Sequence, residues 1–342
     1  MKKGIITFQN ANNYGAVFQS FALQTFMESL DSGGSTEVIN YDSEGMGLKK
    51  IQETVFAEFI NKELNLTKSF NTPKELCGSD YDLIITGSDQ VWNPKLTKSD
   101  GAYFLDFAGE KCIKASYAAS LGIKSEALLE YKPYFKEKLR NFKGISIREE
   151  ANREFMESLD IGQTEIHIDP TLLIEGSEYV KKLNLETDAG MGDYILLFTY
   201  SSAPKLMDVA NMISIKYGLP IISVALGFTE HYLVKGAVGL HSTNPYTWLQ
   251  LIAGAALTVT ESYHGMMLSM AFRRPFLIYT PVKDNVVRIT SALDKFGIRN
   301  RSLKNFDIKS EEVFNIDYGY ADEVLSKERF KASEYLKRLM SL

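Results

Sequence analysis

The segment at residues 260–265, TESYHG, combines a glutamate, a serine and a histidine between a strand-like apolar run and a helical pattern. In an open parallel sheet, ligands bind at the loops that leave the carboxyl ends of the strands, and a helix N-terminus attracts anions. Glu261 and His264 are therefore candidates for proton transfer, and Ser262, His264 and Gly265 are candidates for binding an anion. A histidine that caps the helix or binds a buried carbonyl would explain His264 equally well.

A second polar loop, GSDQVWNP at residues 87–94, also follows a buried-strand pattern. Its side chains offer hydrogen-bond donors, acceptors and an aromatic face, which is what a sugar ring requires. A structural turn would explain some of these residues, but it does not explain why a glutamine stands at Gln90 and a tryptophan at Trp92. We therefore expect Gln90, Trp92 and Asn93 to bind an acceptor sugar, and Asp89 to assist proton transfer.

The loop at residues 9–16, QNANNYGA, is rich in amides and leads directly into a helical pattern that reaches Leu30. The free N–H groups at the start of that helix would suit an anion or a sugar. An ordinary loop that ends in a helix cap fits the same residues. If a ligand binds here, Asn13 and Tyr14 are the expected acceptor-binding residues.

Three basic residues are candidates for binding an anion. Arg148 stands where a strand pattern gives way to a helix, and its planar guanidinium suits a carboxylate or a phosphate. An ion pair with Glu149, or a surface position, is the alternative explanation. Lys283 and Arg288 follow the last strong strand pattern and could reach the same ligand, although basic residues beside a helix are usually solvated.

The composition argues against several classes of function. A net charge of −5 and a pI near 5.6 give no general attraction to nucleic acid. The four histidines and two cysteines lack metal-ligand spacing, and neither a dinucleotide-binding nor a P-loop motif is present. We therefore predict no metal, no cofactor and no nucleic-acid partner. Two widely spaced cysteines, Cys77 and Cys112, fit a reducing compartment.

Elements that alternate between strand and helix must position these loops. A chain of 342 residues exceeds the size of one hydrophobic core, so two domains are expected. Strand patterns separated by helical ones occur in two series, which predicts α/β domains with largely parallel sheets. The expected strands are Gly4–Phe8, Thr36–Tyr41, Asp82–Thr86, Ile113–Ala118 and Gly144–Ile147, then Tyr194–Tyr200, Pro220–Leu226, Ala256–Thr260 and Pro275–Tyr279.

The polar, glycine-containing segment at residues 183–193 is the expected linker. We predict an N-terminal domain at 1–185, a C-terminal domain at 186–320 and a terminal helix at 321–342, and we read 44–74 as an irregular insertion. The N-terminus lacks the apolar core of a signal peptide, and no apolar stretch approaches the roughly 20 residues that cross a bilayer. We expect a cytoplasmic protein. Peripheral contact with the inner face of the membrane and the oligomeric state stay open.

The order and spacing of these segments resemble the polysaccharide pyruvyl transferase family over most of the chain. The resemblance implies an α/β fold of two Rossmann-like domains that face a cleft, as in GT-B glycosyltransferases. It also implies transfer of a pyruvyl group from phosphoenolpyruvate to hydroxyls of a sugar or a lipid-linked oligosaccharide, with the acceptor on the N-terminal side. The matching segments are Asn13–Ala16 with Gln19, Gly87–Asn93, Ser120–Gly122, Ser146–Glu149, Asp169–Thr171 and Thr260–Gly265.

Arg148 and His264 match positions that resemble phosphoenolpyruvate-binding residues of this family. Some members carry an arginine two residues before the histidine, where this chain has Ser262, so Lys283 or Arg288 would have to supply that contact. Two other functions stay open: a GT-B glycosyltransferase that uses a nucleotide sugar, and a non-catalytic carbohydrate-binding relative. The acceptor sugar and the hydroxyls that it contributes are not readable from the sequence.

Overall fold

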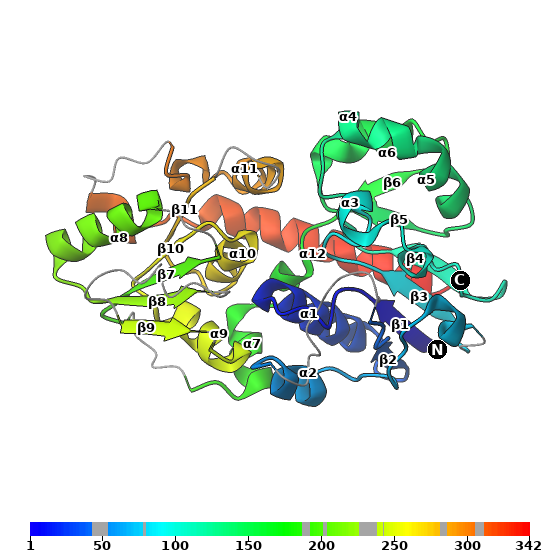
Figure 1. Ribbon diagram of the computed structural model, residues 1–342, viewed down its shortest axis with the longest axis horizontal. Helices are drawn as coiled ribbons and strands as arrows, with labels where there is room; N and C mark the ends of the chain where they lie inside the picture. Colours follow the sequence, from blue (N-terminus) through cyan, green and yellow to red (C-terminus); the bar gives the residue numbers. More distant parts are fainter. Residues whose placement is uncertain are drawn as a thin grey trace. The chain divides into compact units, whose positions relative to one another are not determined.

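The structure, a computed structural model, forms two compact units (Figure 1). Unit 1 comprises residues 1–173 and 326–342, and unit 2 comprises residues 174–325. The residues that the structure describes are 1–42, 54–77, 80–186, 192–200, 204–225, 238–241, 243–280, 286–304 and 311–342.

Unit 1 contains a parallel four-stranded sheet in the order β2-β1-β3-β4 and a parallel pair, β5-β6. Single bridges from β4 and its loop to the β5 segment continue the sheet toward that pair, and helices α4, α5 and α6 gather around it (Figure 1). The strands are β1 (Lys2–Ile6), β2 (Ser35–Val38), β3 (Leu83–Thr86), β4 (Ile113–Ser116), β5 (Ile145–Ile147) and β6 (Thr164–Ile166). The helices are α1 (Tyr14–Leu30), α2 (Ala57–Glu63), α3 (Pro94–Thr97), α4 (Ser125–Leu128), α5 (Lys132–Leu139) and α6 (Arg153–Glu157).

Helix α1 is buried on almost every side, and its buried residues are mostly apolar but include Gln19, Ser20, Gln24 and Thr25. Its start is capped by the side chain of Asn13, which accepts a hydrogen bond from the backbone N–H of Ala16 at 3.3 Å. Phe18 and Phe21 pack their rings against Phe59 of α2, with centroids 5.0 and 5.9 Å apart. The helix is therefore fixed at the carboxyl end of β1, where its first turn borders the loops of the neighbouring strands.

Unit 2 contains one parallel five-stranded sheet in the order β11-β10-β7-β8-β9. Its strands are β7 (Ile195–Thr199), β8 (Ile221–Ala225), β9 (Val238–His241), β10 (Leu257–Thr260) and β11 (Phe276–Ile278). Its helices are α7 (Gly176–Leu183), α8 (Pro204–Tyr217), α9 (Pro245–Gly254), α10 (Tyr263–Ala271) and α11 (Val286–Lys295), and α12 (Gly319–Met340) begins in this unit.

Strand β7 is buried along its whole length, and its first four residues are apolar, because helices cover both faces of its sheet. Successive side chains point to opposite faces, so Ile195 and Leu197 share one core with residues of α8. Phe198 points to the other face and packs against Trp248 of α9, with ring centroids 5.0 Å apart. The prediction of two α/β units with parallel sheets is thereby confirmed, and α8 and α9 lie on opposite faces of this sheet (Figure 1).

The boundary between the units lies at residues 173/174, twelve residues before the predicted one at 185/186. The reason is α7, which packs within unit 2: the Tyr179 ring lies 5.9 Å from the Phe272 ring. A Cβ atom on Gly176 would lie 2.8 Å from the same phenyl ring. The linker predicted at 183–193 is described only in part. The terminal helix is not a separate piece, because α12 starts in unit 2 and continues into unit 1.

Strands β6 and β9 and helices α2, α3 and α7 are among the elements that were not predicted. Strand β6 (TEI) contains a glutamate and strand β9 (VGLH) a glycine, which weakens the apolar pattern by which the equally short β5 and β11 were predicted. Helix α2 lies in the stretch predicted to be irregular, of which residues 44–53 lie outside the described part. Among the described residues, no helix is both long and apolar enough to span a membrane.

The C-terminal half of α12 is anchored on unit 1 by Tyr335. Its hydroxyl donates a hydrogen bond to the carbonyl of Ser116 at 2.7 Å, and its ring lies 4.7 Å from that of His167. Gly144, just before β5, leaves room for it: a Cβ atom there would lie 2.7 Å from the tyrosine hydroxyl and 2.9 Å from Leu339. Glycine at 144 is therefore required by the close approach of α12.

We predict that Gly144→Ala lowers the free energy of unfolding by about 2 kcal/mol, because the added methyl group displaces Tyr335 from Ser116. Tyr335→Phe should lower it by about 1 kcal/mol through the lost hydrogen bond. The double variant should lose less than the sum, since removing the hydroxyl makes room for the methyl group. Chemical denaturation measures each value.

Gly109→Ala is the matched control, because nothing lies within 4 Å of a Cβ atom there. It should change stability by no more than about 0.5 kcal/mol. Equal losses at 109 and 144, or strict additivity with Tyr335→Phe, would contradict the packing explanation.

Candidate functional site

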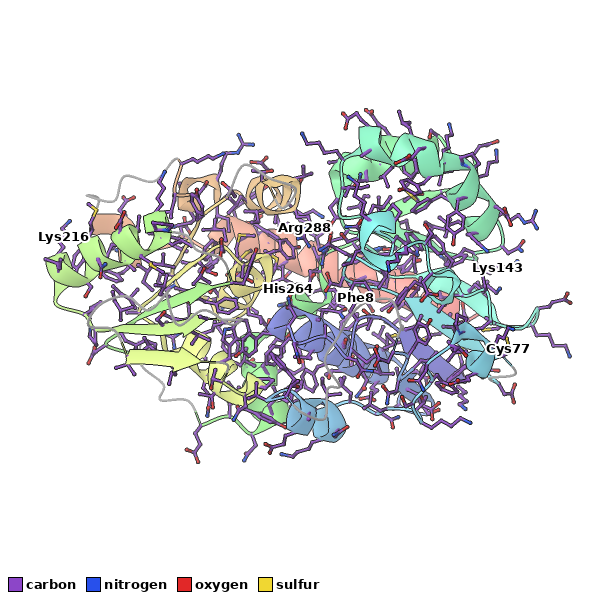
Figure 2. All side chains as sticks on the ribbon, viewed as in Figure 1. Phe8, Cys77, Lys143, Lys216, His264 and Arg288 are labelled. Carbon is purple, nitrogen blue, oxygen red and sulfur yellow. The ribbon has the colours of Figure 1, made fainter. Side chains whose placement is uncertain are left out.

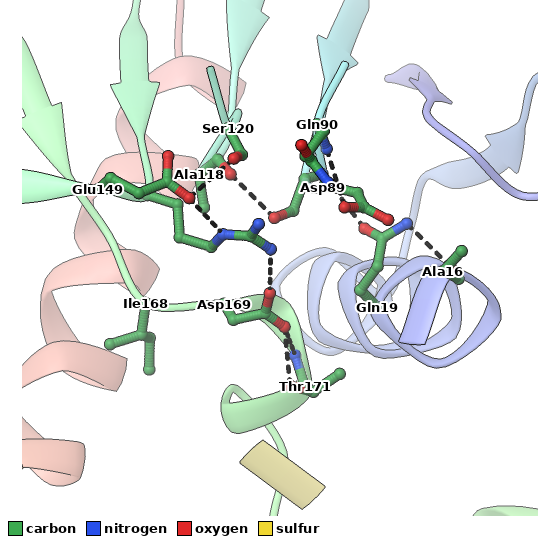
Figure 3. Close-up of polar contacts among 12 residues, drawn as sticks. Ala16, Gln19, Asp89, Gln90, Ala118, Ser120, Glu149, Ile168, Asp169 and Thr171 are labelled. Carbon is green, nitrogen blue, oxygen red and sulfur yellow. Dashed lines mark hydrogen bonds and ion pairs between the residues drawn. The ribbon is translucent and has the colours of Figure 1, made fainter. Parts of the chain in front are cut away.

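The carboxyl ends of β1, β3 and β4 meet at one edge of the unit 1 sheet, and the predicted loop at 87–94 lies there (Figure 3). Asp89 is 9% exposed and adopts a left-handed backbone conformation with φ of 64°. Its Oδ1 accepts a hydrogen bond from the backbone N–H of Gln90 at 2.9 Å. Its carbonyl accepts one from the N–H of Ser120 at 2.8 Å. The turn after β3 is thus tied to the loop after β4.

Arg148 lies at the end of β5 as predicted, but its guanidinium is buried between two carboxylates. Nη1 donates to Asp169 Oδ2 at 2.6 Å, and Nε donates to Glu149 Oε1 at 3.1 Å. Ser120 Oγ donates to the same Glu149 oxygen at 2.7 Å. The structure therefore shows the ion pair with Glu149 that the sequence left open, extended by Asp169. Whether Arg148 also binds a donor anion stays a prediction.

Asp169 connects this ion-pair network to the next element along the chain. Its Oδ1 accepts hydrogen bonds from the backbone N–H and the hydroxyl of Thr171, at 3.0 and 2.7 Å. Thr171 lies in the short 3₁₀ helix Pro170–Leu172, which contacts α1. The loops after β3, β4, β5 and β6 are thus linked side by side, and the chain of contacts returns to α1 (Figure 3).

Trp92 does not serve as a stacking face for a sugar, and that prediction is wrong. The side chain is fully buried, and its indole N–H donates to the carbonyl of Tyr103 at 3.0 Å. Its ring is stacked on Phe104, with centroids 5.8 Å apart and planes 10° apart. The tryptophan follows the strand closely in sequence, but it turns into the core of unit 1.

Tyr14 is also a core residue and not an acceptor-binding one. It is 1% exposed, its ring centroid lies 4.9 Å from that of Phe56, and burial raises the pKa of its hydroxyl well above the ordinary value. Asn13 caps α1, as described above, and is exposed.

The two remaining acceptor candidates, Gln90 and Asn93, form a pair. Asn93 Nδ2 donates to Gln90 Oε1 at 2.8 Å, and Asn93 Oδ1 caps α3 by accepting from the N–H of Lys95 at 3.1 Å. Both amides press against Gly122, whose φ of 70° and lack of a Cβ atom make room for them. Asn93 is buried by these contacts, whereas Gln90 is half-buried and its Nε2 has no hydrogen bond to any described residue.

In unit 2, Glu261 follows β10 and is almost fully buried. Its Oε1 accepts hydrogen bonds from the hydroxyl of Thr199 at 2.6 Å and from the backbone N–H of Tyr200 at 3.1 Å. The Tyr200 hydroxyl donates to the carbonyl of Glu261 at 3.1 Å. The carboxylate therefore ties the end of β10 to the end of β7. These contacts indicate a structural role, in contrast to the predicted role in proton transfer.

The first turn of α10 is built by Ser262 and Gly265. Ser262 Oγ accepts a hydrogen bond from the N–H of Gly265 at 3.1 Å, which caps the helix. A Cβ atom on Gly265 would lie 3.2 Å from Thr260 Oγ1 and 3.3 Å from Phe198, so a larger residue would push the helix away from the sheet. The structure of the helix start therefore explains why a serine stands at 262 and a glycine at 265. Whether these residues also bind the donor stays a prediction.

His264 and Arg288 are brought to the same aromatic ring, that of Tyr263. The His264 ring meets it edge-on at 5.2 Å, and Arg288 Cζ lies 5.7 Å from its centroid. Arg288 comes from α11, so the fold places this predicted donor-binding residue beside the start of α10. Figure 2 labels His264 and Arg288. Lys283, the other candidate, lies outside the described residues. Within the described part, no three His, Cys, Asp or Glu side chains form a metal-binding group.

We predict that Glu261→Gln retains kcat within about threefold, because glutamine keeps the oxygen that accepts from Thr199 and Tyr200. Loss of a general acid or base would cost about 10²-fold or more. Thr199→Val, which removes one donor to Glu261, is the control and should lower the melting temperature without changing kcat. A 10²-fold loss in Glu261→Gln would restore the role in proton transfer.

Solved structures with a similar fold are sugar-nucleotide enzymes. The UDP-GlcNAc 2-epimerase from Neisseria meningitidis, bound to UDP-GlcNAc, is 10% identical, with a TM-score of 0.57 and coverage of 99% of this chain and 100% of that one. A putative UDP-N-acetylglucosamine 2-epimerase from Listeria monocytogenes is 9% identical, with a TM-score of 0.55 and 97% coverage of both chains. These likenesses show the GT-B fold that was predicted.

The comparison of sequences is more specific than that of folds. No curated protein matches the chain significantly. The sequence profile described as polysaccharide pyruvyl transferase matches residues 13–281, which include helix α1 and the loops after β3, β5 and β10. The predicted resemblance is thereby confirmed: this chain belongs to the polysaccharide pyruvyl transferase family.

Proposed function

We propose that this enzyme transfers a pyruvyl group from phosphoenolpyruvate to two hydroxyls of a sugar during polysaccharide biosynthesis. The observation that carries the proposal is the cluster of His264, Tyr263 and Arg288 at the start of α10, in a chain of this family. A titratable group, a cation and the N–H groups of a helix start together offer what an anionic enol phosphate requires.

On the donor side, Arg288 is the cation that we assign to phosphoenolpyruvate. Ser262 cannot supply the charge that an arginine at this position would give some members of the family. In unit 1, Arg148 faces the carboxylates of Glu149 and Asp169, so one positive charge is opposed by two negative charges. An incoming anion would be repelled there unless a carboxylate moved. Arg288 lies over the ring of Tyr263 beside His264 and the start of α10, and we assign the anion to this place.

The chemistry requires one proton acceptor and one proton donor in the first step. A sugar hydroxyl attacks C2 of phosphoenolpyruvate and gives its proton to a base, while an acid protonates the methylene carbon, which becomes the methyl group. The second hydroxyl then displaces phosphate from C2 and closes the ketal, and its proton leaves with the phosphate. We assign the acid to His264 and the base to Asp89.

The acceptor is proposed to bind through unit 1. Asp89, half-buried Gln90 and exposed Asn13 all lie at the ends of strands there, and they offer hydrogen bonds that suit hydroxyls. A sugar linked to a lipid or to a nucleotide fits this role. The second form is included because the Neisseria meningitidis structure with a similar fold is bound to UDP-GlcNAc. For a lipid-linked acceptor, we propose that the enzyme acts at the inner face of the membrane.

We predict that His264→Ala lowers kcat by about 10²-fold or more and leaves the KM for phosphoenolpyruvate within about threefold, since the imidazole acts in the chemical step. His264→Gln, which keeps a hydrogen-bonding side chain, should not restore turnover. The assay follows phosphate release in the presence of sugar acceptors.

Wild-type turnover by His264→Ala would refute its role in the chemical step and leave it as a structural residue of the first turn of α10. If the wild-type enzyme consumed a nucleotide sugar and released no phosphate from phosphoenolpyruvate, the pyruvyl transfer itself would be refuted in favour of glycosyl transfer.

A further inference from the structure

Gln19 is a fully buried amide in helix α1, and it lies against the turn that carries Asp89 (Figure 3). Its Oε1 accepts a hydrogen bond from the backbone N–H of Ser88 at 3.2 Å. Its Nε2 lies 2.9 Å from both Thr7 Oγ1 and the carbonyl of Ala16. One side chain thus joins the helix, the end of β1 and the turn after β3.

The orientation of this amide follows from its partners. The Ser88 N–H can only donate, so it requires the oxygen of Gln19, and the Ala16 carbonyl can only accept, so it requires the nitrogen. Thr7 completes the arrangement, because its hydroxyl accepts from Gln19 and donates to the carbonyl of Ser88 at 2.9 Å. Both backbone groups of Ser88 are therefore held from the side of α1.

The opposite side of the turn is held by the loop after β4. Ser88 Oγ donates to the carbonyl of Ala118 at 2.8 Å, and the N–H of Ser120 donates to the carbonyl of Asp89 at 2.8 Å. Asp89 itself adopts a φ of 64°, which an aspartate leaves readily when nothing constrains it. The position of its carboxylate therefore depends on contacts made by its neighbours.

That carboxylate keeps one oxygen available. Oδ1 accepts from the Gln90 N–H, whereas Oδ2 has no hydrogen bond to any residue in the described part of the chain. We propose that Gln19 is a positioning residue, which fixes the Ser88–Asp89 turn so that Asp89 can accept the proton of the sugar hydroxyl. This inference rests on the proposed function of Asp89 as the base.

The test compares two glutamines of the same helix. Gln19→Met should lower kcat by about 10-fold or more and leave the KM for phosphoenolpyruvate within about twofold, because small displacements of a reacting group are costly. Gln24→Met is the matched control. Gln24 is also buried, and its amide binds the backbone of Glu63, at the end of α2, and of Asn65, just after it. The Gln24→Met variant should lower the melting temperature about as much as Gln19→Met does and leave kcat unchanged.

Thr7→Val is the second variant, since it removes one hydroxyl from the same arrangement with little change of shape. It should lower kcat in the same direction, and it keeps the inference testable if Gln19→Met does not fold.

A double-mutant cycle with Asp89→Asn decides whether Gln19 acts through Asp89. Asp89→Asn should lower kcat by about 10²-fold, and adding Gln19→Met should cause no further loss. Fully additive losses, or a wild-type kcat in both Gln19→Met and Thr7→Val, would overturn the inference and leave the base assignment intact. A wild-type kcat in Asp89→Asn would instead refute the base assignment, and the inference with it.

Discussion

The buried ion pairs of Arg148 are the interaction on which the candidate site of unit 1 depends. A guanidinium removed from water requires partners for its charge, and Asp169 and Glu149 provide them from two successive strand ends. Through Ser120 the same network reaches the turn of Asp89. Replacement of Arg148 by a neutral residue would leave two buried carboxylates uncompensated, at a cost of about 3–5 kcal/mol. The loops are therefore fixed together and not individually.

In unit 2, a single carboxylate holds the ends of two neighbouring strands together. Glu261 receives hydrogen bonds from the end of β7 and so fixes the end of β10, from which α10 starts. The start of α10 determines the position of His264. Arg288, which comes from α11, lies near it because both residues contact the ring of Tyr263. In both units, buried carboxylates tie neighbouring strand ends together: Glu149 and Asp169 do so in unit 1, and Glu261, which the sequence analysis placed in proton transfer, does so in unit 2.

The alternation of strands and helices, and the polar loops after strands, were readable because each pattern is local. The sequence could not separate Trp92 from a ligand-binding tryptophan, since its burial depends on Phe104 and Tyr103, which lie farther along the chain. The boundary was misplaced for a related reason: α7 belongs to unit 2 through Phe272, nearly a hundred residues later. Partners distant in sequence decide which of several polar residues remain available.

The most direct test of this account measures phosphoenolpyruvate binding by calorimetry in Arg148→Lys and Arg288→Lys. Lysine keeps the charge but not the planar fork, so each variant perturbs one guanidinium with little change of net charge. The account predicts that Arg288→Lys weakens binding by about 10-fold or more. Arg148→Lys should lower the melting temperature and leave the Kd unchanged. A weakened Kd in Arg148→Lys, with normal binding in Arg288→Lys, would contradict it and place the donor anion at Arg148.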